Sequence, residues 1–225
     1  MSAQKTPEHF IARQIAYYRA RAPELDLSHH YPTPELRSAM ESFAPRGRVV
    51  ELACGTGIWT EEILRHPIDE LLCIDAAPEM LEIHEARIDD PRVRRERHDL
   101  FAWEAADRYD AVIFAFWLSH VPPTRFAEFW TTVARALTPG GRVFFVDDDH
   151  RAEADEERIP DEDVPLVLRT LNDGTSHVAI KLFHEPHDLA EALTGLGWDA
   201  EVHAAGHRFL WGTASRRWVG ERPRP

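Results

Sequence analysis

The stretch from Glu51 to Gly57 constrains the fold of this chain more than any other part of its sequence. It reads Glu-Leu-Ala-Cys-Gly-Thr-Gly and overlaps a short apolar run, Arg48 to Ala53, with the length and composition of a buried strand. Gly55 and Gly57 allow a tight turn in which no Cβ stands between the backbone and a ligand. A helical pattern begins at about Trp59. The sequence therefore predicts a strand, a glycine-rich turn and a helix, with a ligand bound at the turn.

Strand and helix patterns alternate through the middle of the chain. Alternation of this kind, with strands apolar enough to be covered on both faces, predicts an α/β fold with a doubly wound parallel sheet. Two helices, one ending near Pro23 and one over residues 35–43, precede the sheet. The other expected strands are 71–74, 93–98, 109–115 and 142–146, and the other expected helices begin at Pro78 and span 126–137.

The rhythm changes after residue 147. Residues 166–171 and 176–183 are expected to form a hairpin around Asn172-Asp173-Gly174, which is a strong turn signal. A helix over 186–196 and strands over 199–203 and 208–214 follow. We expect one domain over residues 1–225, with N-terminal helices in 1–45, a cofactor-binding core in 46–147, the inserted hairpin in 148–184, and the last helix and strands in 185–225.

Composition narrows the classes of partner. The 225 residues carry a formal net charge of −13, which argues against a nucleic-acid backbone or an anionic membrane surface as the main partner. The longest apolar runs, such as 111–118, are far shorter than the roughly 20 residues of a membrane helix. The first residues lack the apolar region of a secretion signal. We therefore expect a cytoplasmic protein, with Cys54 and Cys73 as buried free thiols.

Acidic residues follow the ends of three expected strands. Asp75 lies 20 residues after Gly55, where a carboxylate can accept both hydroxyls of a ribose, and Asp99 follows the next strand. A dinucleotide-binding turn would place a third glycine at position 60, where this chain has Thr60. Glu51 would repel a pyrophosphate and would favour a cationic or amino-bearing ligand. These observations weigh against a nicotinamide-dependent oxidoreductase on a similar sheet.

The same residues resemble the motifs of the class I S-adenosylmethionine-dependent methyltransferases, whose acid-x-x-x-Gly-x-Gly turn holds the amino acid end of the cofactor. The resemblance runs from Tyr17 to Ala214. It implies a Rossmann-like fold with a seven-stranded, mostly parallel sheet, S-adenosylmethionine as the cofactor and S-adenosylhomocysteine as the product. It also implies that Asp99 reaches the adenine amino group. The cofactor-binding residues that it implies are Tyr18, Arg21, Glu51, Ala53, Gly55, Thr56, Gly57, Trp59, Asp75, Ala76, Met80, Asp99, Leu100, Phe101 and Ala115.

Two of these residues come from an N-terminal element. Residues 17–22 read Tyr-Tyr-Arg-Ala-Arg-Ala and are similar to an element of a small-molecule subgroup, in which the Tyr and the second Arg cap the carboxylate of the cofactor. Here these are Tyr18 and Arg21. They are three residues apart and therefore on one helix face, as a shared anionic ligand would require.

Further stretches are similar to the phosphonate O-methyltransferases of dehydrophos biosynthesis, namely residues 51–60, 99–103, 114–122 and 169–174. This similarity implies methyl transfer to an anionic oxygen of a small phosphonate by an enzyme with an N-terminal helical lid. The catalytic and substrate-binding residues that it implies are Tyr31, His120, Arg169 and Lys181. Phe116 departs from that subgroup, which has a histidine there, and this reduces the polar character of the pocket.

The chemistry of these residue types agrees with such an acceptor. A phosphonate or carboxylate oxygen is already anionic near neutral pH and needs cations rather than a base; Arg169 can bind two oxygens in a fork and Lys181 supplies a point charge. A phenol or amine would need a base, for which His120 is the candidate. Arg169 shares a strand face with Lys181 if residues 172–174 form a three-residue loop, whereas a two-residue turn separates them.

Several alternatives stay open at this point. The acceptor could be another carboxylate, phenol or amine natural product, or the chain could be a non-catalytic, cofactor-binding partner protein. The 13 histidines show no zinc-site spacing, so we expect no metal. The expected partner is a small molecule, with the chain as a monomer or homodimer. Residues 147–163 hold ten Asp and Glu against two Arg, and we expect a solvated loop or flap beside the pocket.

Overall fold

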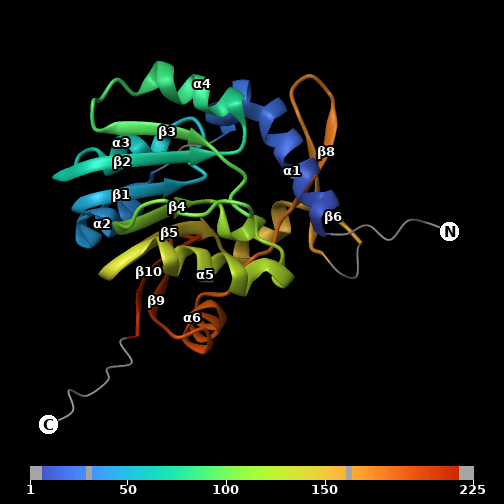
Figure 1. Cartoon of the computed structure of the whole chain (residues 1–225). Helices are drawn as coiled ribbons and strands as arrows, with labels where there is room; N and C mark the ends of the chain where they lie inside the picture. Colours follow the sequence, from blue (N-terminus) through green and yellow to red (C-terminus); the bar gives the residue numbers. More distant parts are fainter. Residues whose placement is uncertain (1–6, 29–31, 161–163, 218–225) are drawn as a thin grey trace, which may run out of the picture.

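The computed structural model describes residues 7–28, 32–160 and 164–217, and a seven-stranded sheet forms its centre (Figure 1). The strand order is β3-β2-β1-β4-β5-β10-β9, and only β10 runs antiparallel to the strands beside it. The expected α/β fold with a mostly parallel seven-stranded sheet is confirmed. The strands are β1 Gly47–Leu52, β2 Ile68–Asp75, β3 Val93–Arg97, β4 Tyr109–Ala115, β5 Leu137–Asp148, β9 Trp198–Ala205 and β10 Phe209–Arg216.

Helices cover both faces of this sheet. Helices α2 (Pro34–Phe43), α3 (Ile58–Ile63) and α4 (Pro78–Arg87) pack on one face, and α5 (Phe126–Ala136) and α6 (Pro186–Gly195) pack on the other. Short 3-10 segments connect these elements at η1 Ala22–Ser28, η2 Leu118–His120, η3 Pro123–Arg125 and η4 His150–Asp155.

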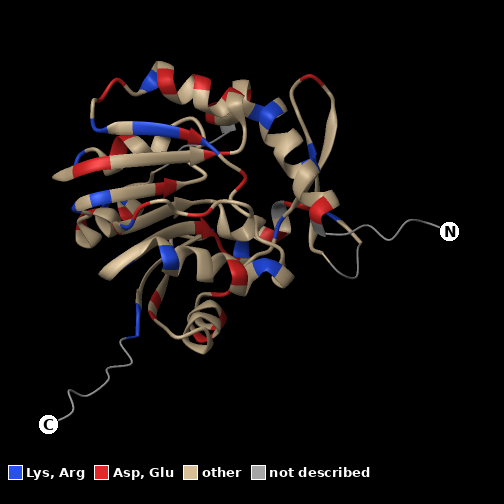
Figure 2. Cartoon of the chain, viewed as in Figure 1, with Lys and Arg blue, Asp and Glu red and all other residues tan. Residues whose placement is uncertain are grey.

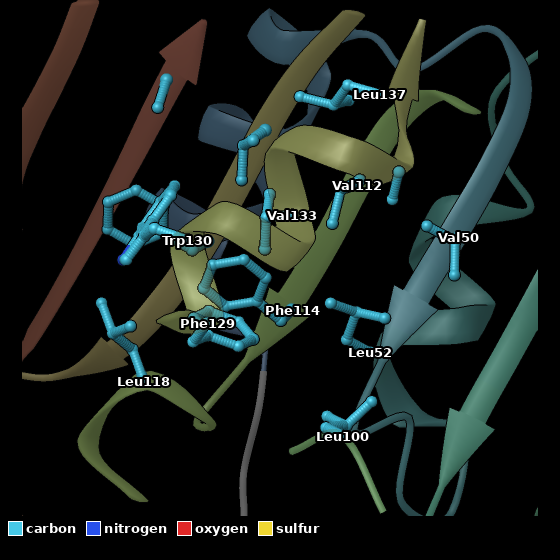
Figure 3. Close-up of a cluster of buried hydrophobic side chains, with 14 of the residues drawn as sticks. Val50, Leu52, Leu100, Val112, Phe114, Leu118, Phe129, Trp130, Val133 and Leu137 are labelled. Carbon is cyan, nitrogen blue, oxygen red and sulfur yellow. The ribbon is translucent and has the colours of Figure 1, made fainter. Parts of the chain in front are cut away.

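Alternation along the central strands explains why they are apolar throughout. In β4, Val112 and Phe114 point toward α5, while Ala111 and Ile113 belong to the cluster under α2 and α3. Figure 3 shows Phe114 next to Phe129 of α5, and the two rings meet edge to face with centroids 5.4 Å apart. A strand buried on both faces carries no polar alternation, so its residues read as one apolar run.

The insertion between β5 and α6 forms a second sheet of three antiparallel strands, β6 (Glu157–Ile159), β7 (Leu166–Thr170) and β8 (Ser176–Ile180). The expected hairpin is present as β7 and β8, and β6 adds a strand to it. The Leu171 N–H donates to the Thr175 carbonyl (2.9 Å), so Asn172-Asp173-Gly174 is a three-residue loop, with Gly174 at φ 83°. This register places Arg169 and Lys181 on the same face.

Helix α1 (Pro7–Arg21) lies along β8, beside the carboxyl ends of the central strands (Figure 1). Because β8 is the edge of its sheet, the Ile180 N–H has no strand partner; it donates instead to Gln14 Oε1 of α1 (3.1 Å). The N-terminal helix and the insertion are thus joined through the edge of a strand. None of the helices in the described part of the chain is long and apolar enough to cross a membrane.

The acidic segment that begins at Asp147 differs from the solvated loop that we expected. Asp147 and Asp149 are completely buried, and residues 157–159 form strand β6. The Asp147 carboxylate accepts hydrogen bonds from the Ser119 and Asp148 backbone N–H groups, both at 2.8 Å. Part of the acidity of the chain therefore has a structural function, because these carboxylates satisfy buried backbone donors.

Candidate functional site

A cavity of about 1050 Å³, part of it open to solvent, lies at the carboxyl ends of β1, β2 and β4. In an open parallel α/β sheet this edge is where ligands bind, next to the point where the strand order reverses. Most of the expected cofactor-binding residues line the cavity: Tyr18, Glu51, Ala53, Gly55, Thr56, Trp59, Asp75, Ala76, Met80, Asp99, Leu100, Phe101 and Ala115.

The glycine-rich turn is held in place by the carboxylate at the end of β2. Gly55 and Gly57 both have left-handed backbone angles, with φ 55° and 93°. The Gly55 N–H donates to Asp75 Oδ2 (3.0 Å), and the Ala77 N–H donates to Asp75 Oδ1 (2.8 Å). Burial raises the pKa of Asp75 although these backbone donors act in the opposite direction. The carboxylate therefore braces the turn while it faces the cavity.

The cavity is negatively charged. Glu51, Asp75 and Asp99 line it, and no Lys or Arg does so among the residues that the structure describes. Figure 2 shows acidic segments at the ends of the central strands, on the side nearest α1. Such a wall fits a ligand that carries positive charge, and it opposes the pyrophosphate of a dinucleotide.

Glu51 is the most deeply placed of these acids. It is 2% exposed, and its Oε2 accepts a hydrogen bond from the Thr60 hydroxyl (2.5 Å). Burial raises the pKa of Glu51 to about 8, and the bond from Thr60 lowers it only in part. A cation beside Glu51 would offset this cost of burial.

Two unused donors and two strained backbone positions also belong to the cavity wall. Within the described residues, the buried Nε1 atoms of Trp59 and Trp117, two residues of the cavity wall, have no hydrogen-bond partner. Ala53 and Phe116, just after β1 and at the end of β4, both have φ of 55°. Left-handed backbone in residues with a Cβ costs free energy and gathers at ligand sites.

Helix α1 closes the cavity with one of its faces. Ile11, Gln14, Ile15 and Tyr18 line the cavity and follow the helical spacing of three and four residues. The Tyr18 hydroxyl is 2.6 Å from His120 Nε2, and His120 Nδ1 is 2.6 Å from the Ile180 carbonyl oxygen. A carbonyl only accepts, so Nδ1 carries the proton and Tyr18 donates to Nε2.

Comparisons with known proteins agree with this geometry. A family model described as "Methyltransferase domain" matches residues 49–141. The solved structure of a DhpI–SAH complex is 38% identical, covers 96% of this chain and 100% of its own, and superposes with a TM-score of 0.79. A DhpI–SAM–HEP complex is 39% identical over 93% of this chain and 99% of its own, also with a TM-score of 0.79.

The chain belongs to the class I S-adenosylmethionine-dependent methyltransferases. The cofactor of this family is S-adenosylmethionine, and the acidic cavity with its glycine turn fits the ammonium and sulfonium charges of that molecule. A trans-aconitate 2-methyltransferase of Pseudomonas aeruginosa is 35% identical over 111 residues, which are 49% of this chain. The matched stretch spans only 38% of the length of that relative.

The two basic residues expected at the acceptor site of the methyltransferase do not line the cavity. Lys181 is 3% exposed, and its Nζ lies 2.8 Å from Asp148 Oδ2, 2.9 Å from Ser119 Oγ and 3.6 Å from Asp147 Oδ1. Arg169 binds the carboxylate of Glu156. Both cations act on Glu156 and lower its pKa, although burial raises that pKa overall. Arg169 therefore pairs directly with Glu156, whereas Lys181 pairs with Asp148 and affects Glu156 only through its charge.

Two other expected residues, Arg21 and Gly57, lie outside the cavity wall. Arg21 bonds the Tyr17 hydroxyl instead of sharing a ligand face with Tyr18. Gly57 stands at the start of α3, where an added Cβ would lie 3.2 Å from the His84 ring. Tyr31 lies outside the described residues. The contributions of these residues to binding stay predictions.

One group of side chains in the methyltransferase has the composition of a metal site. Within the described residues, ligand atoms of Glu51, Cys73 and His84 lie within 4.8 Å of one another. The Thr60 hydroxyl lies among them and bonds both Glu51 and His84, and Arg95 donates to the remaining nitrogen of His84. A hydroxyl and a guanidinium thus take the positions that a cation would need, so we assign this group to hydrogen bonding.

Sequence reasoning missed several residues of the cavity wall. Ile11, Gln14 and Ile15 could have been found from the helical spacing that they share with Tyr18. Leu25, Ile58 and Ala77 carry no such signal, because they reach the wall only through the positions of η1, α3 and α4.

Proposed function

We propose that this methyltransferase methylates an anionic, phosphonate-like oxygen of a small acceptor. The observation that carries the proposal is the positive charge around His120, a residue of the cavity wall. Burial, and after it the charges of Lys181, Arg169 and Arg21, hold the pKa of His120 well below its ordinary value. Three cations that act on one neutral residue create a place for an anion beside the cofactor cavity.

The proposed cofactor contacts follow the acids of the cavity. Asp75 binds the ribose hydroxyls, Asp99 binds the adenine amino group, and Glu51 attracts the ammonium of the amino acid part. In support of this, all three carboxylates line one cavity, and they lie at or near the carboxyl ends of three successive strands, β1, β2 and β3. When bound, S-adenosylmethionine supplies an electrophilic methyl group on a sulfonium.

His120 is unsuited to act as a base in this arrangement. Its Nδ1–H is committed to the Ile180 carbonyl, its Nε2 lone pair accepts from Tyr18, and its pKa is far below the neutral range. A phenol or ammonium acceptor would need such a base, whereas an anionic oxygen needs only positioning and exclusion of water. The protonation of His120 therefore favours an acceptor that is already deprotonated.

The proposed roles of Arg169 and Lys181 are to hold the acceptor anion. In the structure Glu156 already occupies Arg169, so an acceptor anion would replace this carboxylate or share the guanidinium fork with it. Lys181 contributes its positive charge from a position in which its Nζ bonds Ser119 Oγ and the carboxylate of Asp148. Tyr18 can turn its hydroxyl from His120 toward the anion without a change of protonation.

A carboxylate acceptor is the second candidate. One relative is named for trans-aconitate, a tricarboxylate, and it matches only part of this chain. The DhpI complexes, in contrast, match nearly the whole chain and include one with SAM and HEP. Both candidates need the same cationic surroundings, and they differ in the shape of the anion.

The test is the release of S-adenosylhomocysteine over a panel of small phosphonates, carboxylates and phenols. We expect turnover of anionic acceptors, and we expect Arg169→Ala to raise the KM for them at least tenfold while Arg169→Lys keeps part of the affinity. Arg158→Ala is the matched control, because Arg158 lies in the same insertion but is exposed and bound to Glu153. Turnover of neutral acceptors alone, unchanged in Arg169→Ala, would contradict the proposal.

A further inference from the structure

A chain of hydrogen bonds leads from strand β3 to Glu51 at the floor of the cavity. Arg95 Nε donates to His84 Nδ1 (2.8 Å), His84 Nε2 lies 2.9 Å from Thr60 Oγ1, and Thr60 donates to Glu51 Oε2 (2.5 Å). Glu51, Thr60 and His84 are buried. Arg95, the outer end, is half-buried and does not line the cavity.

The direction of every bond in this chain follows from its outer end. A guanidinium has donors only, so His84 Nδ1 must be the acceptor and the proton of the neutral ring must sit on Nε2. Nε2–H then donates to the Thr60 oxygen, and the single hydroxyl proton of Thr60 is left for Glu51. Without Arg95 the ring could hold its proton on Nδ1, and Thr60 could then donate to His84 instead of Glu51.

We propose that Arg95, His84 and Thr60 are positioning residues that keep a hydrogen bond on Glu51 and so set the pH range in which the cofactor's amino group binds. The proposal rests on the cofactor contact of Glu51 proposed above and is independent of the acceptor. It gives a function to Thr60, which stands where a dinucleotide-binding turn has glycine. It also assigns two residues outside the cavity to cofactor affinity.

The charged and titratable groups around the chain support this assignment. Cys73, on the neighbouring strand β2, also donates to Glu51 Oε2 (3.6 Å). Asp75 raises the pKa of Glu51, and burial raises the pKa of both Cys73 and Cys54, so these thiols stay neutral. The cations Arg95 and Arg87 lie near His84 and not beside the carboxylate. Glu51 therefore depends on neutral donors alone.

The neutral His84 ring fixes the direction of the hydrogen bond to Thr60 and adds no charge to the chain of bonds. Burial, Arg95 and Arg87 lower its pKa to about 4, so the ring is neutral throughout the range in which Glu51 titrates. Its tautomer is then the only variable, and Arg95 fixes it. The intermediate position of Thr60, with one proton and two neighbours, makes the arrangement sensitive to that tautomer.

Cofactor binding should consequently release a proton in the neutral range. An ammonium beside Glu51 favours the carboxylate, whereas the cofactor-free protein holds the proton up to about pH 8. The affinity should rise with pH by up to about tenfold per unit below that pKa and level off above it. Loss of the bond from Thr60 raises the pKa of Glu51 further and moves this rise to higher pH.

The experiment is calorimetry with S-adenosylhomocysteine, without any acceptor, between pH 6 and 8.5 in two buffers of different ionisation enthalpy. We expect proton release in the wild type, and binding about tenfold weaker at pH 7 in Thr60→Val, with its affinity still rising at pH 8.5. Thr60→Ser keeps the hydroxyl and should behave as the wild type. Arg95→Met should shift the pH profile in the same direction as Thr60→Val.

Arg94→Met is the matched control, because it removes one charge from the same strand but leaves His84 untouched. Arg95 also donates to the Ile88 carbonyl (2.6 Å), so thermal unfolding of each variant separates lost stability from a shifted pH profile. A wild-type affinity that is flat over this range would overturn the proposal. So would Thr60→Val and Arg95→Met variants that bind more weakly but keep the wild-type pH profile.

Discussion

The floor of the cofactor cavity and the two cations of the insertion, Lys181 and Arg169, differ in how their charges are paired. In the cavity, Glu51 and Asp75 accept hydrogen bonds from a hydroxyl, a thiol and backbone N–H groups, all of which are neutral. In the insertion, Lys181 and Arg169 each meet a carboxylate, from Asp148 and Glu156. Among the described residues, no Lys or Arg lines the cavity beside its acids, whereas each of these two cations of the insertion is paired with a carboxylate.

This difference teaches how each region can bind an ion. The cavity can take a cation without losing an existing ion pair, so the gain in electrostatic energy is available to the bound state. An anion at the insertion has to replace a carboxylate of the same chain or share a cation with it, so part of that gain is lost. Affinity for the cofactor should thus exceed affinity for the acceptor.

The largest expected effect is the loss of stability on replacing Lys181, which tests whether this residue stabilises the fold in addition to its proposed role in binding. Lys181→Met removes the ammonium beside the buried carboxylate of Asp147 and leaves Asp148 with Arg208 alone, and we expect the free energy of unfolding to fall by about 3 kcal/mol or more. Arg169 is 28% exposed, so Arg169→Met should cost about 1 kcal/mol. Urea unfolding measures both, and equal losses would remove the distinction between the two cations.

Asp75→Ala tests the cavity side of the comparison. We expect binding of S-adenosylhomocysteine to weaken by about 10- to 100-fold, because the variant loses a ribose acceptor and the bonds that brace the glycine turn. Asp75→Asn keeps one oxygen acceptor, so its affinity for S-adenosylhomocysteine should lie between those of the wild type and Asp75→Ala. Calorimetry at pH 8 provides the measurement, and an unchanged affinity in Asp75→Ala would refute the ribose role.

Gly57→Ala tests how tightly the turn is packed against α4. The new Cβ would lie 3.2 Å from His84 Cδ2 and from Ile88 Cγ1, at a residue with φ 93°. Gly140→Ala is the control, since Gly140 has φ 84° but no atom within 4 Å of an added Cβ. In urea unfolding, we expect the free energy of unfolding to fall by about 2 to 3 kcal/mol in Gly57→Ala and by about 1 kcal/mol in Gly140→Ala. Similar losses of stability in the two variants would mean that α4 shifts to accommodate the new Cβ at no cost in free energy.

Glu51 should also make the stability of the cofactor-free protein depend on pH. Folding raises the pKa of Glu51 from 4.5 to about 8, so between these values the folded state holds a proton that the unfolded chain has lost. The contribution of Glu51 to stability is therefore present below pH 4.5 and is lost as the pH rises toward 8. Unfolding of Glu51→Gln should show a weaker decline, by up to about 3 kcal/mol between pH 5 and 8. Parallel pH curves would contradict the raised pKa.

The sequence predicted the central sheet because its strands are buried on both faces. The runs at β1, β4 and β5 are apolar enough to read as strands without any knowledge of their neighbours. Strand β6 was missed because Glu157-Arg158-Ile159 is short and charged, and it is extended only through pairing with β7. The burial of Asp147 could not be predicted from the sequence either, because one of the N–H groups that bond its carboxylate belongs to the distant Ser119 and the other to Asp148.

The site was predictable where a motif lies within one stretch of chain. Glu51, Gly55, Asp75 and Asp99 follow strand ends in order, and the structure brings all four to one cavity. Partners across the fold were not predictable, because the bond between Tyr18 and His120 joins residues 102 positions apart. The pairing of Arg169 with Glu156 likewise depends on a strand that the sequence did not reveal.

The attachment of α1 has a consequence for the timing of ligand exchange. Gln14 bonds both the Ile180 N–H and the His120 carbonyl, and Tyr18 bonds the His120 ring, so one helix is fastened to the insertion and to the cavity wall together. A displacement of α1 that uncovers the cavity must break these bonds in a single event. Cofactor loading and product departure then depend on the same bonds, and a mutation that loosens Gln14 should accelerate both steps.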